Sequence, residues 1–120
     1  MAAKNEIIRT GGNGRRSTCT AHGGLVYVSG ITTVLLEADI TGQTQDVLNQ
    51  IDRLLAANGS NKTRVLSADI TLADMADYGN FNAAWDQWVS DDNEPARRVA
   101  GGQLALSEYR VKISLVAAQS

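Results

Sequence analysis

Cysteine, proline and histidine are nearly absent from this sequence of 120 residues, which holds one of each. A lone cysteine, Cys19, cannot form a disulfide within the chain. One histidine and one cysteine are also too few for the His and Cys ligand sets that hold most zinc ions in proteins. We therefore expect no disulfide and no metal, and a reducing, cytoplasmic compartment.

Long hydrophobic runs and an excess of positive charge are missing as well. No window reaches the roughly 20 apolar residues that are needed to cross a bilayer, and residues 1–6 lack the apolar stretch of a signal peptide. The formal net charge is -2, and the 11 lysines and arginines are scattered along the chain. Without a basic stripe to attract phosphates, we expect neither a nucleic acid nor a membrane as a partner.

The length and composition are those of one globular domain spanning residues 1–120, with 43% hydrophobic and 20% charged residues. Short apolar or alternating runs predict β-strands at residues 4–10, 17–21, 25–29, 65–72, 97–105 and 109–117. The turn residues His22-Gly23-Gly24 predict that the second and third strands form a hairpin. In the fourth strand, alternation places one set of residues on a single face: Leu66, Ala68, Ile70 and Leu72.

Two helices are predicted by apolar residues that recur at intervals of three and four. The first begins at an N-cap, Asp39 or Thr41, and ends at Asn58-Gly59. The second opens at Asp74 and ends before Pro95. Its apolar stripe is aromatic and is assigned to the core: Tyr78, Phe81, Trp85 and Trp88.

One strand separates these helices, and the other strands are expected to form hairpins. This order predicts an α+β, two-layer fold with both helices on one face of the sheet. The other face then needs a cover, and Gly101-Gly102 in the strand 97–105 indicates close contact between backbones. We expect the cover to come from oligomerisation.

The familiar catalytic motifs are absent, including the phosphate-binding loop, paired-cysteine, zinc-protease and nucleophile-elbow patterns. No helix follows Gly11-Gly12-Asn13-Gly14, so we interpret this segment as a plain turn. Histidine is the commonest general base, but His22 adjoins two glycines and is interpreted as a solvated turn residue. Cys19 is expected to be buried and inert.

Two adjacent arginines, in Pro95-Ala96-Arg97-Arg98, open a predicted strand. Their side chains lie on opposite faces of that strand, so one of them must find an anion if the sheet is covered. A guanidinium can grip a carboxylate through two parallel hydrogen bonds, which suits the binding of a small organic acid. From spacing alone, a salt bridge to Asp91, Asp92 or Glu94 explains Arg97 equally well.

Four motifs together resemble the RidA/YjgF family of reactive-intermediate deaminases. They run in order over nearly the whole chain: Val26-Tyr27-Val28-Ser29-Gly30, the helix 43–51, the stretch 72–78 with Asn82, and Pro95-Ala96-Arg97. The turn 58–62 and the helix segment 84–89 are similar to the YoaB-like branch. The resemblance implies a chorismate-mutase-like fold with a mixed β-sheet, assembled as a homotrimer with ligand clefts between subunits.

The resemblance also implies an activity: hydrolysis of enamine or imine intermediates, such as 2-aminoacrylate, to 2-keto acids and ammonia without a cofactor. Carried over residue by residue, Arg97 corresponds to the arginine that grips the substrate carboxylate. Ser29 and Gly30 correspond to the strand end that lines the cleft, and Asn82 to a pocket asparagine. Backbone groups near Gly30 and Val99 are expected to polarise the substrate.

Three departures from the family pattern affect the expected chemistry. Ser114 stands where the deaminases place a glutamate for the attacking water, within Lys112-Ile113-Ser114, and Arg16 stands where they have a tyrosine. Ile31 replaces a glutamine. A serine can orient water but cannot take its proton as a carboxylate does, while a second arginine strengthens the hold on an anion, such as a diacid.

Two hypotheses follow from these residues. In the first, the protein is an imine deaminase in which Arg97 holds the carboxylate and Ser114 holds the water. In the second, it is a non-catalytic trimer that binds or senses small carboxylates, or an accessory regulatory protein.

Overall fold

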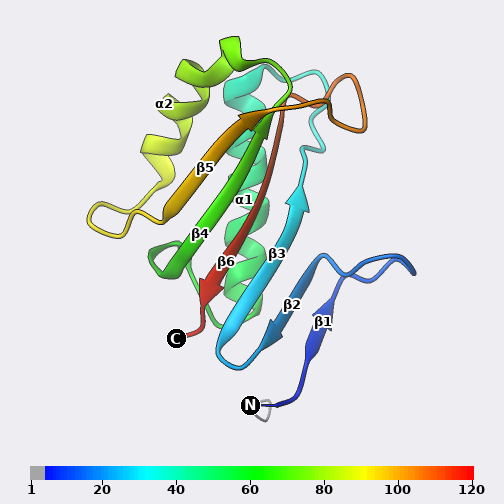
Figure 1. The fold of residues 1–120 in the computed structure, drawn as a ribbon, viewed down its shortest axis with the longest axis vertical. Helices are drawn as coiled ribbons and strands as arrows, with labels where there is room; N and C mark the ends of the chain where they lie inside the picture. Colours follow the sequence, from blue (N-terminus) through cyan, green and yellow to red (C-terminus); the bar gives the residue numbers. More distant parts are fainter. Residues whose placement is uncertain (1–4) are drawn as a thin grey trace.

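The computed structural model describes residues 5–120, which form a six-stranded mixed sheet backed by two helices (Figure 1). The elements are β1 (Ile8–Thr10), β2 (Cys19–His22), β3 (Leu25–Ile31), α1 (Ile40–Ala57), β4 (Val65–Leu72), α2 (Tyr78–Trp88), β5 (Ala96–Gly101) and β6 (Val111–Ala118). Short 3-10 turns precede β4 and α2. The predicted order of elements is confirmed, although the start of the first predicted strand, at Lys4, lies outside the described residues.

The strands lie in the order β1-β2-β3-β6-β4-β5, and only the β4-β5 pair is parallel. The expectation that all remaining strands form hairpins is therefore wrong for β5. Because α2 carries the chain back across the sheet after β4, β5 pairs in parallel beside it, as such crossovers require. In consequence β1 and β5 form the two opposite edges of the sheet.

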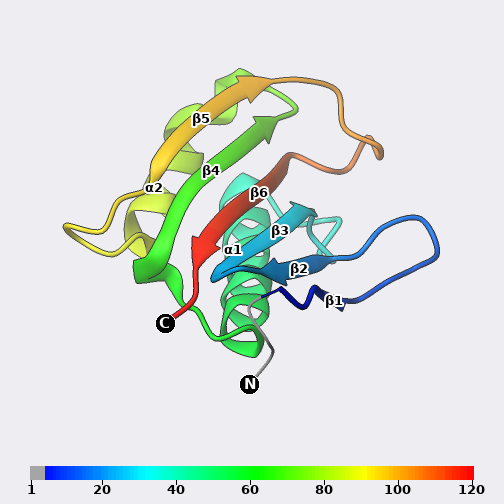
Figure 2. The same ribbon diagram turned by 60° about the horizontal axis from the view of Figure 1, so that its bottom comes forward.

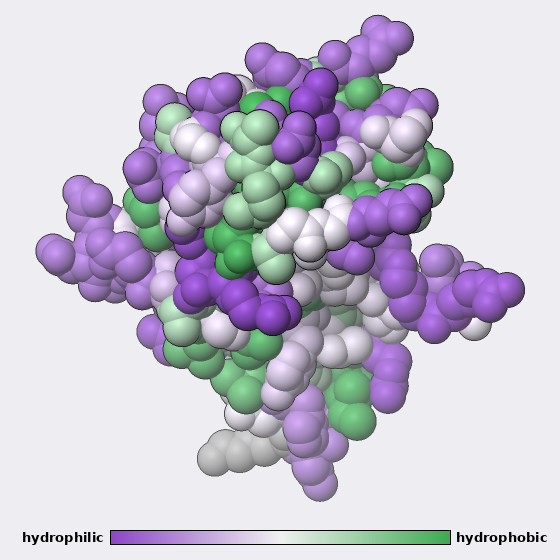
Figure 3. Space-filling model, turned by 45° about the horizontal axis from the view of Figure 1, so that its top comes forward, coloured by the Kyte–Doolittle hydropathy of each residue, from purple (hydrophilic) through white to green (hydrophobic). Residues whose placement is uncertain are grey.

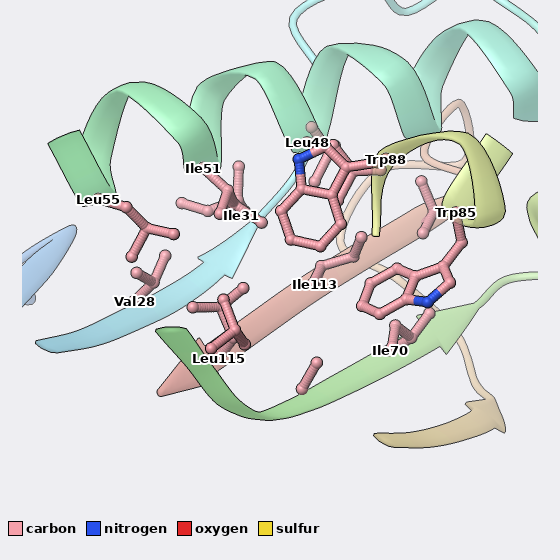
Figure 4. Packing of buried hydrophobic residues seen from close by; sticks show 14 of the residues in the cluster. Val28, Ile31, Leu48, Ile51, Leu55, Ile70, Trp85, Trp88, Ile113 and Leu115 are labelled. Atoms are coloured by element: carbon pink, nitrogen blue, oxygen red, sulfur yellow. The ribbon is translucent and has the colours of Figure 1, made fainter. Parts of the chain in front are cut away.

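Both helices cover the same face of the sheet, and the opposite face is open (Figure 2). Asp39 caps α1 by accepting a hydrogen bond from the Gly42 amide at 2.9 Å, which decides between the two predicted caps. Trp85 and Trp88 lie between the helices and the strands, as Figure 4 shows. The indole Nε1 of Trp88 donates to Asp52 at 2.9 Å, so this buried polar atom is satisfied. The prediction that both tryptophans belong to the core is confirmed.

Four details of the predicted elements are wrong. The second helix spans Tyr78–Trp88 instead of opening at Asp74 and ending just before Pro95, and Asp74 caps a short 3-10 turn that precedes it. Leu66 is 50% exposed instead of buried, because a bulge between Val65 and Ser67 shifts the alternation of β4. Tyr78 does not belong to the buried aromatic stripe, because it is 41% exposed at the start of α2. The strand predicted over 97–105 ends at Gly101.

The segment after β5 is held by a buried glutamine rather than by strand pairing. The Gln43 side chain is fully buried, and its amide nitrogen donates to the carbonyls of Ala38 and Glu108. Its amide oxygen accepts from the backbone nitrogen of Arg110 at 2.9 Å. This single side chain therefore ties the entry of β6 to the first turn of α1.

Candidate functional site

Arg97 lies on the edge strand β5 with its side chain toward α2. Its Nη1 atom donates to Oδ1 of Asn82 at 2.9 Å, and its guanidinium carbon lies 5.3 Å from the ring centre of Trp85. The ring of Phe81 is 5.8 Å away. An amide oxygen and two aromatic faces fix the orientation of this cation without neutralising it. Arg97 is exposed, so its remaining donors face solvent in the single chain.

Arg98 takes the opposite face, as alternation predicts. Its Nε atom bonds to Oδ1 of Asp69 on β4 at 3.1 Å, and both side chains are largely exposed. Among the described residues, no carboxylate forms an ion pair with Arg97, so the predicted alternative of a bridge to the 91–94 loop is not observed. Of the two adjacent arginines, Arg97 is the one with charge left for a ligand.

A bulge at the end of β3 brings Ser29 and Gly30 to the open face together. Val28 pairs with Leu115 and Ile31 pairs with Ile113, so two residues of β3 stand opposite the single residue Ser114 of β6. Val28 and Ile31 point into the core. Ser29, Gly30 and Ser114 are therefore neighbours on one surface.

Arg16 is held beside this bulge by the loop between β1 and β2. Asn13 shapes the loop by accepting hydrogen bonds from the amides of Arg15 and Arg16, each at 2.9 Å. The Nη1 atom of Arg16 then donates to Oγ1 of Thr18 at 3.2 Å and to Oγ of Ser29 at 3.3 Å. Two of the predicted site residues are thus in direct contact.

Lys112 belongs to the same surface and was not predicted as a site residue. Its alkyl chain crosses Gly30: a Cβ atom built on that glycine would lie 2.8 Å from Cδ of Lys112. The signal was present in the sequence, because Lys112 is two residues from Ser114 on the same strand and so shares its face. Within the Lys112-Ile113-Ser114 segment, both polar residues lie on the open face of the sheet.

A single chain does not bring all predicted site residues together. Arg16, Ser29, Gly30 and Ser114 lie on the open face near β3, whereas Arg97, Asn82 and the side chain of Val99 lie toward α2 at the β5 edge. Three strand spacings separate β3 from β5 in the sheet order, about 14 Å. A hollow of about 680 Å³ beyond the end of β5 is lined by none of these residues.

Loops of opposite charge project from the two edges of the sheet (Figure 1). The loop between β1 and β2 carries Arg15 and Arg16, and the loop between α2 and β5 carries Asp91, Asp92 and Glu94. Figure 3 shows hydrophilic side chains standing out at both sides of the molecule, with hydrophobic residues scattered between them. The two loops are therefore electrostatically complementary to each other.

The remaining candidates have structural explanations. Cys19 is 1% exposed, and burial raises the pKa of its thiol, which confirms the prediction of a buried cysteine. His22 is exposed at the hairpin turn, with Nδ1 3.3 Å from the carbonyl oxygen of Glu6. The segment 11–14 is a turn with positive φ at Gly11 and Gly14. In residues 5–120, no group of three or more His, Cys, Asp or Glu side chains is placed to hold a metal ion, and no helix is long and apolar enough to cross a membrane.

Asp46 of α1 anchors the segment that follows the bulge. Its Oδ2 atom accepts from Thr33 Oγ1 at 2.8 Å, from the Val34 amide at 3.0 Å and from Gln50 at 3.1 Å. Burial alone would raise the pKa of Asp46, but these hydrogen bonds and the nearby charge of Arg53 outweigh it, and the pKa is lowered. The ionised carboxylate therefore stabilises the fold.

The lowered pKa predicts a pH-dependent stability. The stabilisation by Asp46 is complete above the pKa of an unfolded aspartate, about 3.9, and is lost as the pH falls through the lower folded value. Asp46→Asn should therefore be less stable than the unmodified chain at pH 7, and this difference should shrink below pH ~4. Urea unfolding between pH 7 and pH ~2.5 measures it, with Asp86→Asn, an exposed residue on α2, as the matched control. A difference that stays constant over this range would contradict the role given to Asp46.

Comparisons with known proteins place this geometry in a family. A family model described as "Endoribonuclease L-PSP" matches residues 12–119. A RutC family protein from Haemophilus influenzae is 40% identical over 104 residues, which cover 86% of this chain and 90% of that protein. The RutC family protein YoaB of Escherichia coli is 38% identical over 112 residues, or 93% of this chain and 97% of that protein.

A solved structure agrees with the sequence matches. NMB1025 of Neisseria meningitidis, described as a member of the YjgF protein family, superposes with a TM-score of 0.92 at 39% identity, covering 98% of both chains. This chain belongs to the RidA/YjgF family. Within that family the chain is similar to YoaB, as the turn 58–62 and the segment 84–89 predict. Membership accounts for the mixed sheet with two helices on one face.

Proposed function

We propose that this RidA/YjgF protein hydrolyses enamine and imine intermediates of the 2-aminoacrylate type to 2-keto acids and ammonia. The observation that carries the proposal is that the guanidinium of Arg97 is oriented but, within residues 5–120, not neutralised. Its guanidinium is oriented by Asn82 and by the ring of Trp85, yet no carboxylate among the described residues neutralises it. A planar cation held in this way is suited to grip the carboxylate of a small 2-imino acid.

The complete site is proposed to form between copies of the chain in a homotrimer. Arg97 and the Ser29–Gly30 bulge lie toward opposite edges of one sheet, too far apart to hold one small molecule. The oppositely charged loops at those edges favour a head-to-tail contact, in which the β5 edge of one copy meets the β1–β3 side of the next. A ring of copies then repeats the same composite site and covers the open sheet face.

The chemistry needs an oriented water and a positioned substrate. An enamine first gains a proton at its terminal carbon and loses one from its nitrogen, which converts it to the imine. Water then adds to the imine carbon while the nitrogen takes up a proton, and the resulting carbinolamine expels ammonia as the keto acid forms. In the proposed site Arg97 holds the carboxylate, backbone amides near Gly30 and Val99 polarise the substrate, and the Ser114 hydroxyl positions the water.

The serine is also the observation that favours a second function. A hydroxyl cannot act as the proton acceptor that a glutamate would provide, and the carboxylate in register with it, Asp69, is paired with Arg98. A non-catalytic carboxylate binder or sensor would keep Arg97 and need no base. It predicts saturable binding of a 2-keto acid without any acceleration of imine hydrolysis.

Nucleic acid is not the partner that we propose, although the matching family model is described as an endoribonuclease. Phosphate binding needs a basic surface, whereas the chain has a net charge of -2 and an acidic loop beside Arg97. Its free thiol and small-molecule chemistry fit the cytoplasm.

The activity is tested by generating 2-aminoacrylate in place from serine with a separate lyase and following keto acid and ammonia. We expect the protein to accelerate keto acid formation at least about tenfold over buffer, since positioning and water orientation each contribute factors of this size or more. A rate equal to that of buffer, from protein shown to be folded and oligomeric, would overturn the proposal. Saturable keto acid binding in that same sample would then support the second function.

A further inference from the structure

Two cations at the β3 bulge have no carboxylate partner among the described residues. Arg16 touches Ser29, and Lys112 lies across Gly30, so the two charged side chains approach adjacent residues of the same bulge. Neither takes part in an ion pair within residues 5–120. By contrast Arg98 and Arg110 both pair with carboxylates, at 3.1 and 3.4 Å. The charges of Arg16 and Lys112 are therefore not neutralised by any carboxylate of the described residues.

Arg16 presents most of its hydrogen-bonding capacity outward. Only Nη1 is engaged, by the hydroxyls of Thr18 and Ser29. A guanidinium carries five N–H donors, and Nε and Nη2 make no hydrogen bond within the described part of the chain. Thr18 in turn donates to the Gly11 carbonyl at 3.1 Å, so the hydroxyl that holds Arg16 is itself fixed. The orientation of the free edge is thus set before any ligand binds.

The path of Lys112 depends on the absence of a side chain at position 30. Three carbons of the lysine, Cγ, Cδ and Cε, lie 2.8 to 3.3 Å from where a Cβ of residue 30 would be. A lysine on β6 can therefore lie flat against β3 only over a glycine. Its alkyl chain packs on the backbone while its ammonium group stays in solvent.

We propose that Arg16 and Lys112 bind a second anionic group, so that the preferred substrate is the imine of a dicarboxylic 2-amino acid. This inference rests on the proposed function: Arg97 of one copy holds the carboxylate next to the imine carbon. Arg16 and Lys112 of the neighbouring copy hold the carboxylate at the far end. Two uncompensated cations at one bulge repel each other, and a carboxylate that bridges them relieves this repulsion while making charge-assisted hydrogen bonds. An imine with a single carboxylate has no group at its far end that could make these hydrogen bonds or relieve the repulsion.

The test compares two ligands that differ only at the far end: 2-oxoglutarate, which ends in a carboxylate, and 2-oxopentanoate, which ends in a methyl group. Calorimetry on the assembled protein gives the ratio of their dissociation constants. We expect 2-oxoglutarate to bind at least about tenfold more tightly, since hydrogen bonds between charged groups are the strong ones. In Lys112→Met, which keeps the alkyl chain, the ratio should fall severalfold, and in Lys112→Met combined with Arg16→Gln it should approach about one.

Arg15→Gln is the matched control, because Arg15 lies in the same loop with an exposed side chain that makes no hydrogen bond in the described residues. It should leave the ratio unchanged. A ratio near one in the unmodified protein, or a ratio that survives the double substitution, would overturn the inference. Binding is measured without turnover, so the two failures can be told apart. A protein that binds 2-oxoglutarate selectively but hydrolyses no imine retains the second anion site at Arg16 and Lys112 and refutes the deaminase activity, and with it the dicarboxylic imine as a substrate.

Discussion

Replacing Arg97 with glutamine is expected to lower kcat/KM for imine hydrolysis by about a hundredfold or more. The substitution removes two charge-assisted hydrogen bonds to the substrate carboxylate, each contributing about 1.5 to 3 kcal/mol. The side chain is exposed and, within residues 5–120, contacts only Asn82 and two aromatic rings, so the fold should tolerate the change. Steady-state rates with imine generated in place, together with the melting temperature, measure both effects.

Arg98 provides the matched control, because it is the same residue type one position along the strand. Arg98→Gln removes an exposed ion pair with Asp69 on the opposite face, which contributes little to stability. We expect it to change kcat/KM by less than about threefold, as surface ion pairs away from a site usually do. Equal losses in the two variants would show that Arg97 has no special role in the reaction.

Helices and strands could be predicted where apolar residues recur at the spacing of one face, because that spacing depends only on the geometry of the element itself. The three- and four-residue spacing of apolar side chains predicted α1, and aromatic spacing placed Trp85 and Trp88 in the core. The bulge at Leu66 could not be predicted, since an alternating run does not show where one strand has an extra residue. The parallel pairing of β5 depends on which distant strand lies beside it, and the order of residues along the chain leaves that open.

The candidate site likewise has features that the sequence predicts and features that depend on the register of the strands. Alternation shows that Arg97 and Arg98 point apart, but the face that each one takes depends on the register of β5 against β4. The motifs identified Ser29 and Gly30, whereas their common exposure depends on the bulge in β3. Lys112 was overlooked, although its two-residue spacing from Ser114 is visible in the sequence.

Two variants that are inactive alone are expected to restore activity when they share one oligomer. Gly30 has no positive φ, so Gly30→Leu is allowed by the backbone. The new side chain would displace Lys112 and enter the space that we propose for the substrate. Arg97→Gln disables the other half of the site. If each site takes Arg97 from one copy and the bulge from the next, a mixed oligomer contains a site in which both halves are intact.

The stoichiometry gives the size of the effect. In a ring of three copies that contains both variants, one of the three interfaces joins an intact Arg97 to an intact bulge, so activity should be about one third of that of the unmodified protein. Co-expression with two different affinity tags, followed by purification on both, isolates the mixed rings. Each variant purified alone serves as the baseline.

This experiment tests most directly whether the site is built between copies of the chain. If the site is composite, doubly tagged oligomers of Arg97→Gln and Gly30→Leu recover activity to about one third, while each variant alone stays near the buffer rate. Mixed oligomers that remain as inactive as either variant alone would contradict it, because a site contained within one chain has a defective half in every copy.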